Sequence, residues 1–341
     1  MTIKKSLFIA AIMLLATTMA NAAKKTIYKP WSNGKLKVSA NQRYLIHENG
    51  TPFFWLGNTA WLLPERLNRD EAEYFLAKER ELGYNVEQIQ VLNAIPTFNV
   101  YGQQANNKEF DFSKVSKPGV YGYWEHLDYI IDRAADNGIY IAMDCIWGSM
   151  IGQMDVKKAA AYGKFLGERY KDKPNIIWMI GGDILGDKSP EVWDALARAI
   201  KKYDNRHIMT FHPRGRTTSA RWFNDREWMD FNMFQSGHRR YGQRNGDGDY
   251  TIKDNTEEDN WRYVDMSFEK KPLKPVIDGE PSYEDIPQGL HDLWPLLRDA
   301  VHASWSARLV RSRKAMVGGN ERPWLQTDEI PEMAYACLPV H

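Results

Sequence analysis

The chain has 341 residues, of which 43% are hydrophobic, 13% aromatic and 26% charged. Such a composition is typical of a globular protein with a sizeable core and excludes a disordered, collagen-like or coiled-coil chain. Lysine and arginine number 45 against 44 aspartate and glutamate, so the net charge of +1 creates no field that attracts a polyanion. We therefore expect no nucleic-acid partner. The two cysteines, Cys145 and Cys337, are far apart, which argues against a disulfide framework or a cysteine zinc site and leaves one distant bridge as the alternative.

The first 22 residues have the pattern of an export signal. Lys4 and Lys5 precede an apolar run over residues 7–19, and Ala20-Asn21-Ala22 forms a small-x-small cleavage site. The apolar run is about 13 residues long, shorter than the roughly 20 needed to cross a bilayer. We expect cleavage after Ala22, which leaves a mature chain of 341 − 22 = 319 residues. This chain is expected in the periplasm or outside the cell, without stable membrane insertion.

A short hairpin is predicted before a regular alternation of strands and helices. Gly50-Thr51 separates two apolar runs, 44–46 and 52–56, as a hairpin turn does. The strand-like runs of the main fold are residues 53–56, 84–92, 139–147, 175–180, 207–211, 230–234 and 275–277. Helical patterns lie between them at residues 69–82, 123–137, 156–170, 191–203 and 255–268.

This regular alternation requires a parallel sheet, which either a doubly wound fold or a closed barrel provides. A Gly-rich phosphate turn after the first strand, the usual mark of the doubly wound fold, is absent. We therefore predict an α/β fold of the (β/α)₈ TIM-barrel type, with seven readable βα units, an eighth that the pattern does not reveal, and the N-terminal β-hairpin. The predicted divisions are a signal peptide (1–22), an extension with the hairpin (23–52), a catalytic barrel (53–300) and a divergent tail (301–341).

The predicted strand ends carry amides, carboxylates, imidazoles and indoles. Catalytic groups of a barrel lie at these ends, and this mixture suits the hydroxyl groups and the apolar face of a sugar. We therefore expect an oligosaccharide or polysaccharide substrate. Polar networks or aromatic packing in the barrel mouth are the alternative roles for these side chains. The candidate sugar contacts are Asn58, Trp61, Gln90, Asp144, Trp147, His212, Gln235 and His238.

Metal binding is a further alternative for His212 and His238. The first strand lacks the His-x-His pair that is common in metal-dependent barrel hydrolases. Residues 245–249, Asn-Gly-Asp-Gly-Asp, lack the spaced ligands and the closing glutamate of a calcium loop. We expect no metal and no cofactor.

Two acidic residues, Asp183 and Glu280, are the candidates for a catalytic pair. Glycoside hydrolysis uses one carboxylic acid as general acid and a second carboxylate as nucleophile or base. Each candidate follows an apolar strand and a glycine, so each is expected to project from a strand end. The alternatives are a helix cap for Asp183 and an ion pair for Glu280. Strand alternation places Asp278 on the same face as Glu280, one layer deeper, as a structural acid.

Five motifs follow one another along the chain. They occupy residues 53–61 (Phe-Phe-Trp-Leu-Gly-Asn-Thr-Ala-Trp), 175–183, 210–213, 230–238 and 274–281. Together they resemble the apiosidase-like catalytic domain of glycoside hydrolase family 140, over about residues 40 to 300. The resemblance implies a (β/α)₈ barrel followed by a small β-sandwich, and release at β-D-apiofuranosyl linkages of the pectic polysaccharide rhamnogalacturonan II. It also implies Asp183 as general acid/base, where many barrel glycosidases carry Asn-Glu, and Glu280 as nucleophile.

The family pattern fades after about Arg298. Residues 304–314 are rich in arginine and serine, and residues 326–341 show no sustained period of 3.6 or 2. A divergent last unit and a premature or frame-shifted end are the two interpretations. An open barrel leaves strand edges unpaired. Three functions therefore remain: a glycosidase acting on pectic glycan, which we favour, a catalytically impaired carbohydrate-binding relative, and a glycosidase of different linkage specificity.

Overall fold

A computed structural model describes residues 27–112, 115, 119–237 and 260–281. The predicted export signal, the predicted tail and His238 lie outside these residues. In chain order, the strands are β1 (Leu36–Val38), β2 (Leu45–His47), β3 (Gly57–Thr59), β4 (Val86–Gln90), β5 (Tyr140–Asp144), β6 (Ile176–Ile184), β7 (Met209–Pro213), β8 (Thr217–Thr218), β9 (Asn232–Gln235) and β10 (Val276–Asp278).

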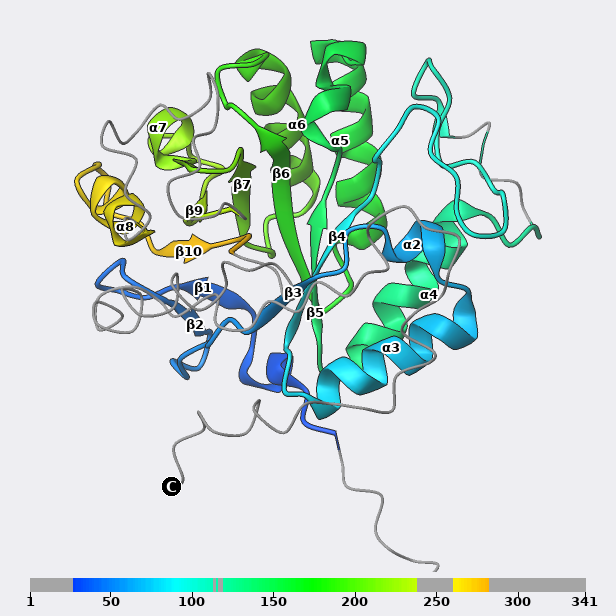
Figure 1. The fold of residues 1–341 in the computed structure, drawn as a ribbon, viewed down its shortest axis with the longest axis horizontal. Helices are drawn as coiled ribbons and strands as arrows, with labels where there is room; N and C mark the ends of the chain where they lie inside the picture. Colours follow the sequence, from blue (N-terminus) through cyan, green and yellow to red (C-terminus); the bar gives the residue numbers. More distant parts are fainter. Residues whose placement is uncertain (1–26, 113–114, 116–118, 238–259, 282–341) are drawn as a thin grey trace, which may run out of the picture.

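The central strands run parallel and follow chain order. Strands β3 to β7 form one parallel sheet, and β9 pairs in parallel with β10. The backbone N–H of Asp230 donates to the carbonyl of Met209 at 2.9 Å, which places the start of β9 beside β7. Seven parallel strands therefore succeed one another, as predicted, in an α/β fold of the TIM-barrel type (Figure 1). The predicted eighth unit falls outside the described residues.

The predicted helices are present and cover the sheet. They are α3 (Arg69–Glu81), α4 (Tyr123–Asp136), α5 (Val156–Tyr170), α6 (Pro190–Tyr203) and α8 (Asn260–Phe268), with short turns η1 (Pro30–Asn33), α2 (Leu63–Arg66), η3 (Gly148–Gln153) and α7 (Ala220–Phe223). The side chain of Asn68 accepts from the N–H of Glu71, and Glu71 accepts from the N–H of Asn68, so a reciprocal cap begins α3. Pairs α3–α4 and α5–α6 lie side by side (Figure 1). In the described part of the chain, every helix is too short or too polar to span a bilayer.

Three local features differ from the prediction. The predicted first strand at 53–56 is displaced, because pairing with β4 begins at Gly57. The predicted hairpin is present, with Phe53 N–H donating to the Leu45 carbonyl at 2.9 Å, and β1 adds a further antiparallel strand beside β2. Strand β8 is an insertion that pairs antiparallel with β9 and that the sequence pattern did not predict.

Two hydrophobic clusters lie on opposite sides of the strands. Alternate strand residues point to opposite faces, and strands β4, β5 and β7 are buried throughout. The outer cluster packs between sheet and helices and includes Ile89, Ile141, Trp178, Leu127 and Leu196. The inner cluster fills the barrel and includes Val86, Ala142, Met179, Met233 and Ile277. A filled interior closes the middle of the barrel, so chemistry is confined to the strand ends.

Candidate active site

A bulge at the end of β6 presents Asp183. Three consecutive residues have positive φ, with Gly181 at 113°, Gly182 at 99° and Asp183 at 50°. The pairing of β6 with β7 shifts register between Gly181 and Ile184. A Cβ at Gly182 would lie only 2.5 Å from Asp144 Oδ2, so the absence of a side chain allows the strands to approach. A left-handed conformation outside glycine is uncommon and often marks a functional site.

The surroundings of Asp183 favour its protonated form. Although Asp183 is accessible to solvent, desolvation and then the charge of Glu280 raise the pKa of its carboxyl above the ordinary value. The backbone N–H of Gly215 donates to Asp183 Oδ1 at 3.3 Å, and this hydrogen bond lowers the pKa of the carboxyl. A carboxyl with a raised pKa can hold a proton for donation to a leaving group.

Glu280 follows β10 and is held by donors from two other strand ends. Trp61 Nε1 donates to Oε1 at 3.3 Å, and Gln235 Nε2 donates to Oε2 at 2.9 Å. His212 Nε2 lies 3.4 Å from the same Oε2. Glu280 is 5% exposed. Donors that converge on a buried carboxylate favour its charged form and fix its orientation.

His212 connects the two carboxylates. Its ring is fully buried at the end of β7, and Nδ1 lies 3.4 Å from the backbone N–H nitrogen of Asp183. Burial opposes a charge on the ring, but the hydrogen bond and charge of Glu280, followed by the charges of Asp144 and Asp183, raise the pKa of His212. The imidazole therefore lies between the acid and the second carboxylate.

Asp144 is a third acid of this region, at the end of β5. Its side chain is fully buried, and neither oxygen has a side-chain hydrogen-bond partner in the described ranges. Desolvation raises the pKa of Asp144 to about 8, although the charge of His212 acts against this. Gln90 lies beside Asp144 in the parallel register of β4 and β5. These surroundings favour the protonated form of Asp144, in which the carboxyl can donate a hydrogen bond.

Two indoles form one wall of the site. The rings of Trp61 and Trp147 have centroids 5.4 Å apart, and each also approaches His212, at 5.2 Å and 6.3 Å respectively. Trp147 is partly exposed, whereas Trp61 is buried. The structure thus brings six of the eight predicted sugar contacts and both predicted catalytic acids toward the same strand ends, and the other two positions are described next.

Asn58 lies on the other side of the sheet. Because β3 begins at Gly57, Asn58 is inside the strand, in register with Glu87, and its amide donates to Glu79 Oε2 of α3 at 3.2 Å. Its side chain therefore belongs to the interface between sheet and helix and is separate from the carboxylate site. His238, the other position, lies outside the described residues and stays a prediction. Six predicted sugar contacts thus share the site: Trp61, Gln90, Asp144, Trp147, His212 and Gln235.

Asp278 has the structural role predicted for it, by a different geometry. It accepts from the hydroxyl of Ser236 at 2.6 Å and from the N–H of Glu280 at 3.3 Å. The neighbouring Ile277 faces the barrel interior, so Asp278 faces outward. The strand ends at Asp278, which releases Glu280 from the alternation and allows it to join the site.

Sequence reasoning missed two groups that shape the site. Gln88 Nε2 donates to the Gly279 carbonyl at 2.7 Å and supports the backbone before Glu280. Its position two residues before Gln90, on the same strand face, was the available signal. The Gly215 N–H that contacts Asp183 follows β7 in a loop, where no residue pattern indicates it. Among the described residues, no three His, Cys, Asp or Glu side chains form a metal-binding group.

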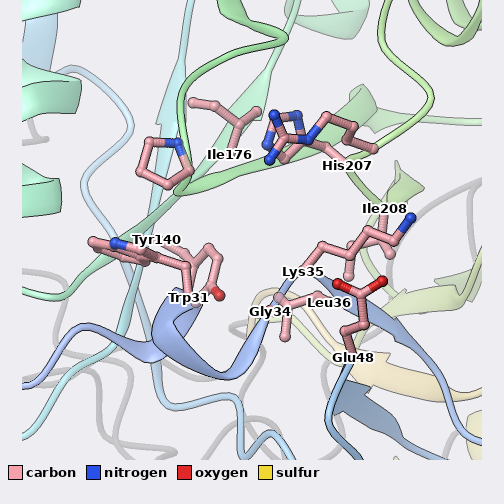
Figure 2. A pocket seen from close by; sticks show the side chains of 11 residues that line it. Trp31, Gly34, Lys35, Leu36, Glu48, Tyr140, Ile176, His207 and Ile208 are labelled. Atoms are coloured by element: carbon pink, nitrogen blue, oxygen red, sulfur yellow. The ribbon is translucent and has the colours of Figure 1, made fainter.

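A separate cavity of about 440 Å³ lies at the opposite end of the strands. Figure 2 shows Trp31 and Leu36 of the N-terminal segment facing Tyr140 and Ile176, the first residues of β5 and β6. The Trp31 and Tyr140 rings meet edge to face with centroids 5.6 Å apart. Because catalytic groups of barrels occupy the carboxyl ends of strands, this cavity lies away from the chemistry.

A TIM-barrel-type fold with two carboxylates, a histidine and indoles at the carboxyl ends of its strands defines the glycoside hydrolase class. Comparison with known families agrees. Residues 39–315 match the family described as apiosidase-like, catalytic domain. The chain belongs to this apiosidase-like family. The match also extends past Arg298, where the readable motifs end.

Solved structures give the same class. A glycoside hydrolase is 66% identical, with a TM-score of 0.75 over 78% of this chain and 60% of its own. A glycoside hydrolase family 5 protein from Bacteroides vulgatus ATCC 8482 is 66% identical, with a TM-score of 0.74 over 79% of this chain and 58% of its own. This chain therefore spans about three-fifths of the length of these two structures.

A distant structure shares the fold alone. The endo-1,4-beta-mannanase from Rhizomucor miehei is 14% identical, with a TM-score of 0.50 over 73% of this chain and 82% of its own. No curated protein matches the chain. The barrel is thus common to distant enzymes, whereas the family assignment rests on the match over residues 39–315.

Proposed function

We propose that the protein hydrolyses glycosidic bonds in plant pectic glycan, at β-D-apiosyl linkages of rhamnogalacturonan II, with retention of configuration. One contrast carries the proposal. Desolvation and the charge of Glu280 raise the pKa of Asp183, whereas N–H donors of Trp61 and Gln235 converge on Glu280. Different environments thus assign one carboxyl to the proton and the other to the charge, as a two-carboxylate glycosidase requires.

The chemistry proceeds in two displacements. Asp183 donates its proton to the glycosidic oxygen while the Glu280 carboxylate attacks the anomeric carbon, so the bond to the leaving group breaks and a glycosyl ester forms. Asp183, now ionised, then takes a proton from water. The water oxygen attacks the anomeric carbon, and the ester bond breaks to return the Glu280 carboxylate.

The indole wall supports a carbohydrate as the substrate class. Trp147 is partly exposed beside Trp61, and an indole face packs well against the apolar face of a sugar. Gln90 and Asp144 supply polar groups next to this wall. The pectic source, the apiosyl linkage and the role of Glu280 as nucleophile come from the resemblance to the apiosidase-like family and are the parts of the proposal that experiment must decide.

Incubation of the purified protein with rhamnogalacturonan II fragments and with simpler pectins tests the proposal. We expect apiosyl cleavage and new reducing ends only from the former, with the product first released in the configuration of the substrate. Asp183→Asn and Glu280→Gln serve as matched inactive controls. Product that persists in both variants contradicts the proposal. Binding without cleavage by the wild type identifies a carbohydrate-binding relative, and inverted product assigns Glu280 as a base.

The pattern of residues 1–22 supports export of the protein from the cytoplasm. The Lys4-Lys5 start, the apolar run and the Ala20-Asn21-Ala22 site are typical of a cleaved export signal. The proposed enzyme therefore acts in the periplasm or outside the cell, where plant glycan is encountered.

A further inference from the structure

The ring of His212 contacts both proposed catalytic residues, which gives it a role beyond sugar binding. Nδ1 lies 3.4 Å from the backbone nitrogen of Asp183, and Nε2 lies 3.4 Å from Glu280 Oε2. A backbone N–H can only donate, so Nδ1 must accept and carries no proton in this arrangement. The proton of the neutral ring is consequently on Nε2, directed at Glu280.

We infer that His212 is a positioning residue, which the bulge N–H of Asp183 fixes as the Nε2–H tautomer so that the ring donates to Glu280. This inference rests on the proposed function, because it assigns the histidine to the orientation of the proposed nucleophile. Glu280 Oε2 then accepts from Gln235 and has the Nε2–H of His212 at 3.4 Å, while Oε1 accepts from the indole of Trp61.

The bulge at the end of β6 connects this hydrogen bond to the acid. The left-handed backbone at Asp183 directs its N–H toward His212, and its carboxyl accepts from Gly215. Asp183 thus supplies the proposed acid with its side chain and orients His212 with its backbone N–H. A displacement of the bulge therefore alters the donor on Glu280 as well as the position of Asp183.

The charged neighbours of the ring make its protonation state matter. The titratable groups that face His212 are Asp144 from β5, Asp183 from β6 and Glu280 from the end of β10. Whichever of these acids is ionised favours a second proton on the ring, yet a proton on Nδ1 would point at the Asp183 N–H and break the hydrogen bond between them. The neutral tautomer keeps the hydrogen bond from the Asp183 N–H and leaves Nε2–H facing Glu280 Oε2 at 3.4 Å, so it is the form that orients the proposed nucleophile.

Direct observation of the ring nitrogens tests the tautomer without any substrate. In protein labelled with ¹⁵N-histidine, two-bond ¹H–¹⁵N spectra recorded as the pH is raised until the His212 ring is neutral distinguish the two tautomers. The His212 signal is assigned by its absence from His212→Gln. We expect an unprotonated Nδ1 and a protonated Nε2. A neutral ring with its proton on Nδ1 overturns the inference whatever the activity.

A matched pair of variants tests the role in hydrolysis. Gln places an amide N–H near the position of Nε2, whereas Asn places its amide near Nδ1 and leaves Glu280 without this donor. We expect His212→Asn to lower kcat/KM by roughly 10- to 100-fold and to move the acidic limb of the pH profile to higher pH, because the Glu280 carboxylate loses stabilisation. His212→Gln should retain the wild-type limb and more of the activity.

Equal losses in the two variants with an unmoved acidic limb overturn the inference, because a merely structural histidine behaves in that way. Wild-type protein that cleaves no glycan but shows the Nε2–H tautomer overturns the proposed function and leaves the hydrogen-bond assignment standing. If one variant fails to fold, the other supplies the assignment of the His212 signal, and the spectra of the wild type still decide the tautomer.

Discussion

Buried acids occur in two regions of the barrel, and their surroundings differ. At the carboxyl ends of the strands, Asp144 and Glu280 share a site with the imidazole of His212. Between the sheet and α3, Glu79 and Glu87 are both fully buried, and Asn58 donates to Glu79. Neither oxygen of Glu87 has a hydrogen-bond partner within the described ranges.

The difference lies in the donors that surround each buried acid and in its access to substrate. Desolvation, and then the charge of Glu79, raise the pKa of Glu87 well above its ordinary value, so the interface between sheet and helix favours the protonated form of Glu87. Glu280 instead lies among N–H donors at the mouth of the barrel. A carboxyl needs both a compensating donor set and access to substrate before it can serve as a nucleophile.

The same isosteric change in the two regions should have opposite effects on turnover. We expect Glu280→Gln to lower kcat by about 10⁴-fold, because an amide cannot form the glycosyl ester. Glu87→Gln should leave kcat within about threefold of the wild type, since surface and interface changes remote from the chemistry act mainly on stability. Initial rates on the cleaved glycan measure both, and a comparable loss in Glu87→Gln would abolish the distinction between the regions.

Stability should respond to pH through Glu87. In the folded chain Glu87 keeps its proton at a pH where the unfolded chain, with an ordinary pKa of 4.5, has released it. The free energy of unfolding therefore falls as pH rises above that value, by about 1.4 kcal/mol per pH unit for one such group, until the folded pKa is reached.

Glu87→Gln removes this dependence. We expect the free energy of unfolding of the variant to rise relative to that of the wild type as the pH is raised from 5 to 7, as measured by urea unfolding. Glu191→Gln, on the exposed first turn of α6, is the matched control for the chemical change. A difference between Glu87→Gln and wild type that stays constant with pH would mean that Glu87 is ionised in the folded chain.

The smallest effect is expected at Asn58. Asn58→Ala removes the amide that donates to Glu79 Oε2, which should lower the free energy of unfolding by about 1 kcal/mol. KM for the glycan should stay within about twofold, because the side chain faces α3 and lies apart from the carboxylate site. A tenfold rise in KM, with stability unchanged, would place Asn58 in the sugar-binding site after all.

The order of the strands could be predicted because each βα unit is local in sequence. The strand at 139–147 and the helix at 156–170 could each be predicted from their own apolar period and end signals. The structure has β5 and α5 in these ranges. The face of Asn58 could not be predicted in this way. Strand alternation has a period of two, so the displaced start of β3 decides which side of the sheet the residue occupies.

The parts of the site that escaped prediction depend on contacts distant in sequence. Asp183 and Glu280 could be recognised because each follows an apolar strand and a glycine. The Asp183 N–H and His212 are 29 positions apart in the sequence. Their contact depends on the bulge at the end of β6, which no local sequence pattern predicts. Likewise, the exit of Glu280 from strand alternation depends on where pairing with β9 stops.

The left-handed backbone at Asp183 has a practical consequence for structural work on bound sugars. Asparagine and aspartate adopt this conformation more readily than other residues that carry a side chain. Asp183→Asn therefore keeps the bulge and retains an oxygen that can accept from Gly215, while it removes the acidic proton. If Asp183 is the acid of the proposed mechanism, the variant traps intact substrate for crystallography, whereas a larger residue at this position would distort the bulge.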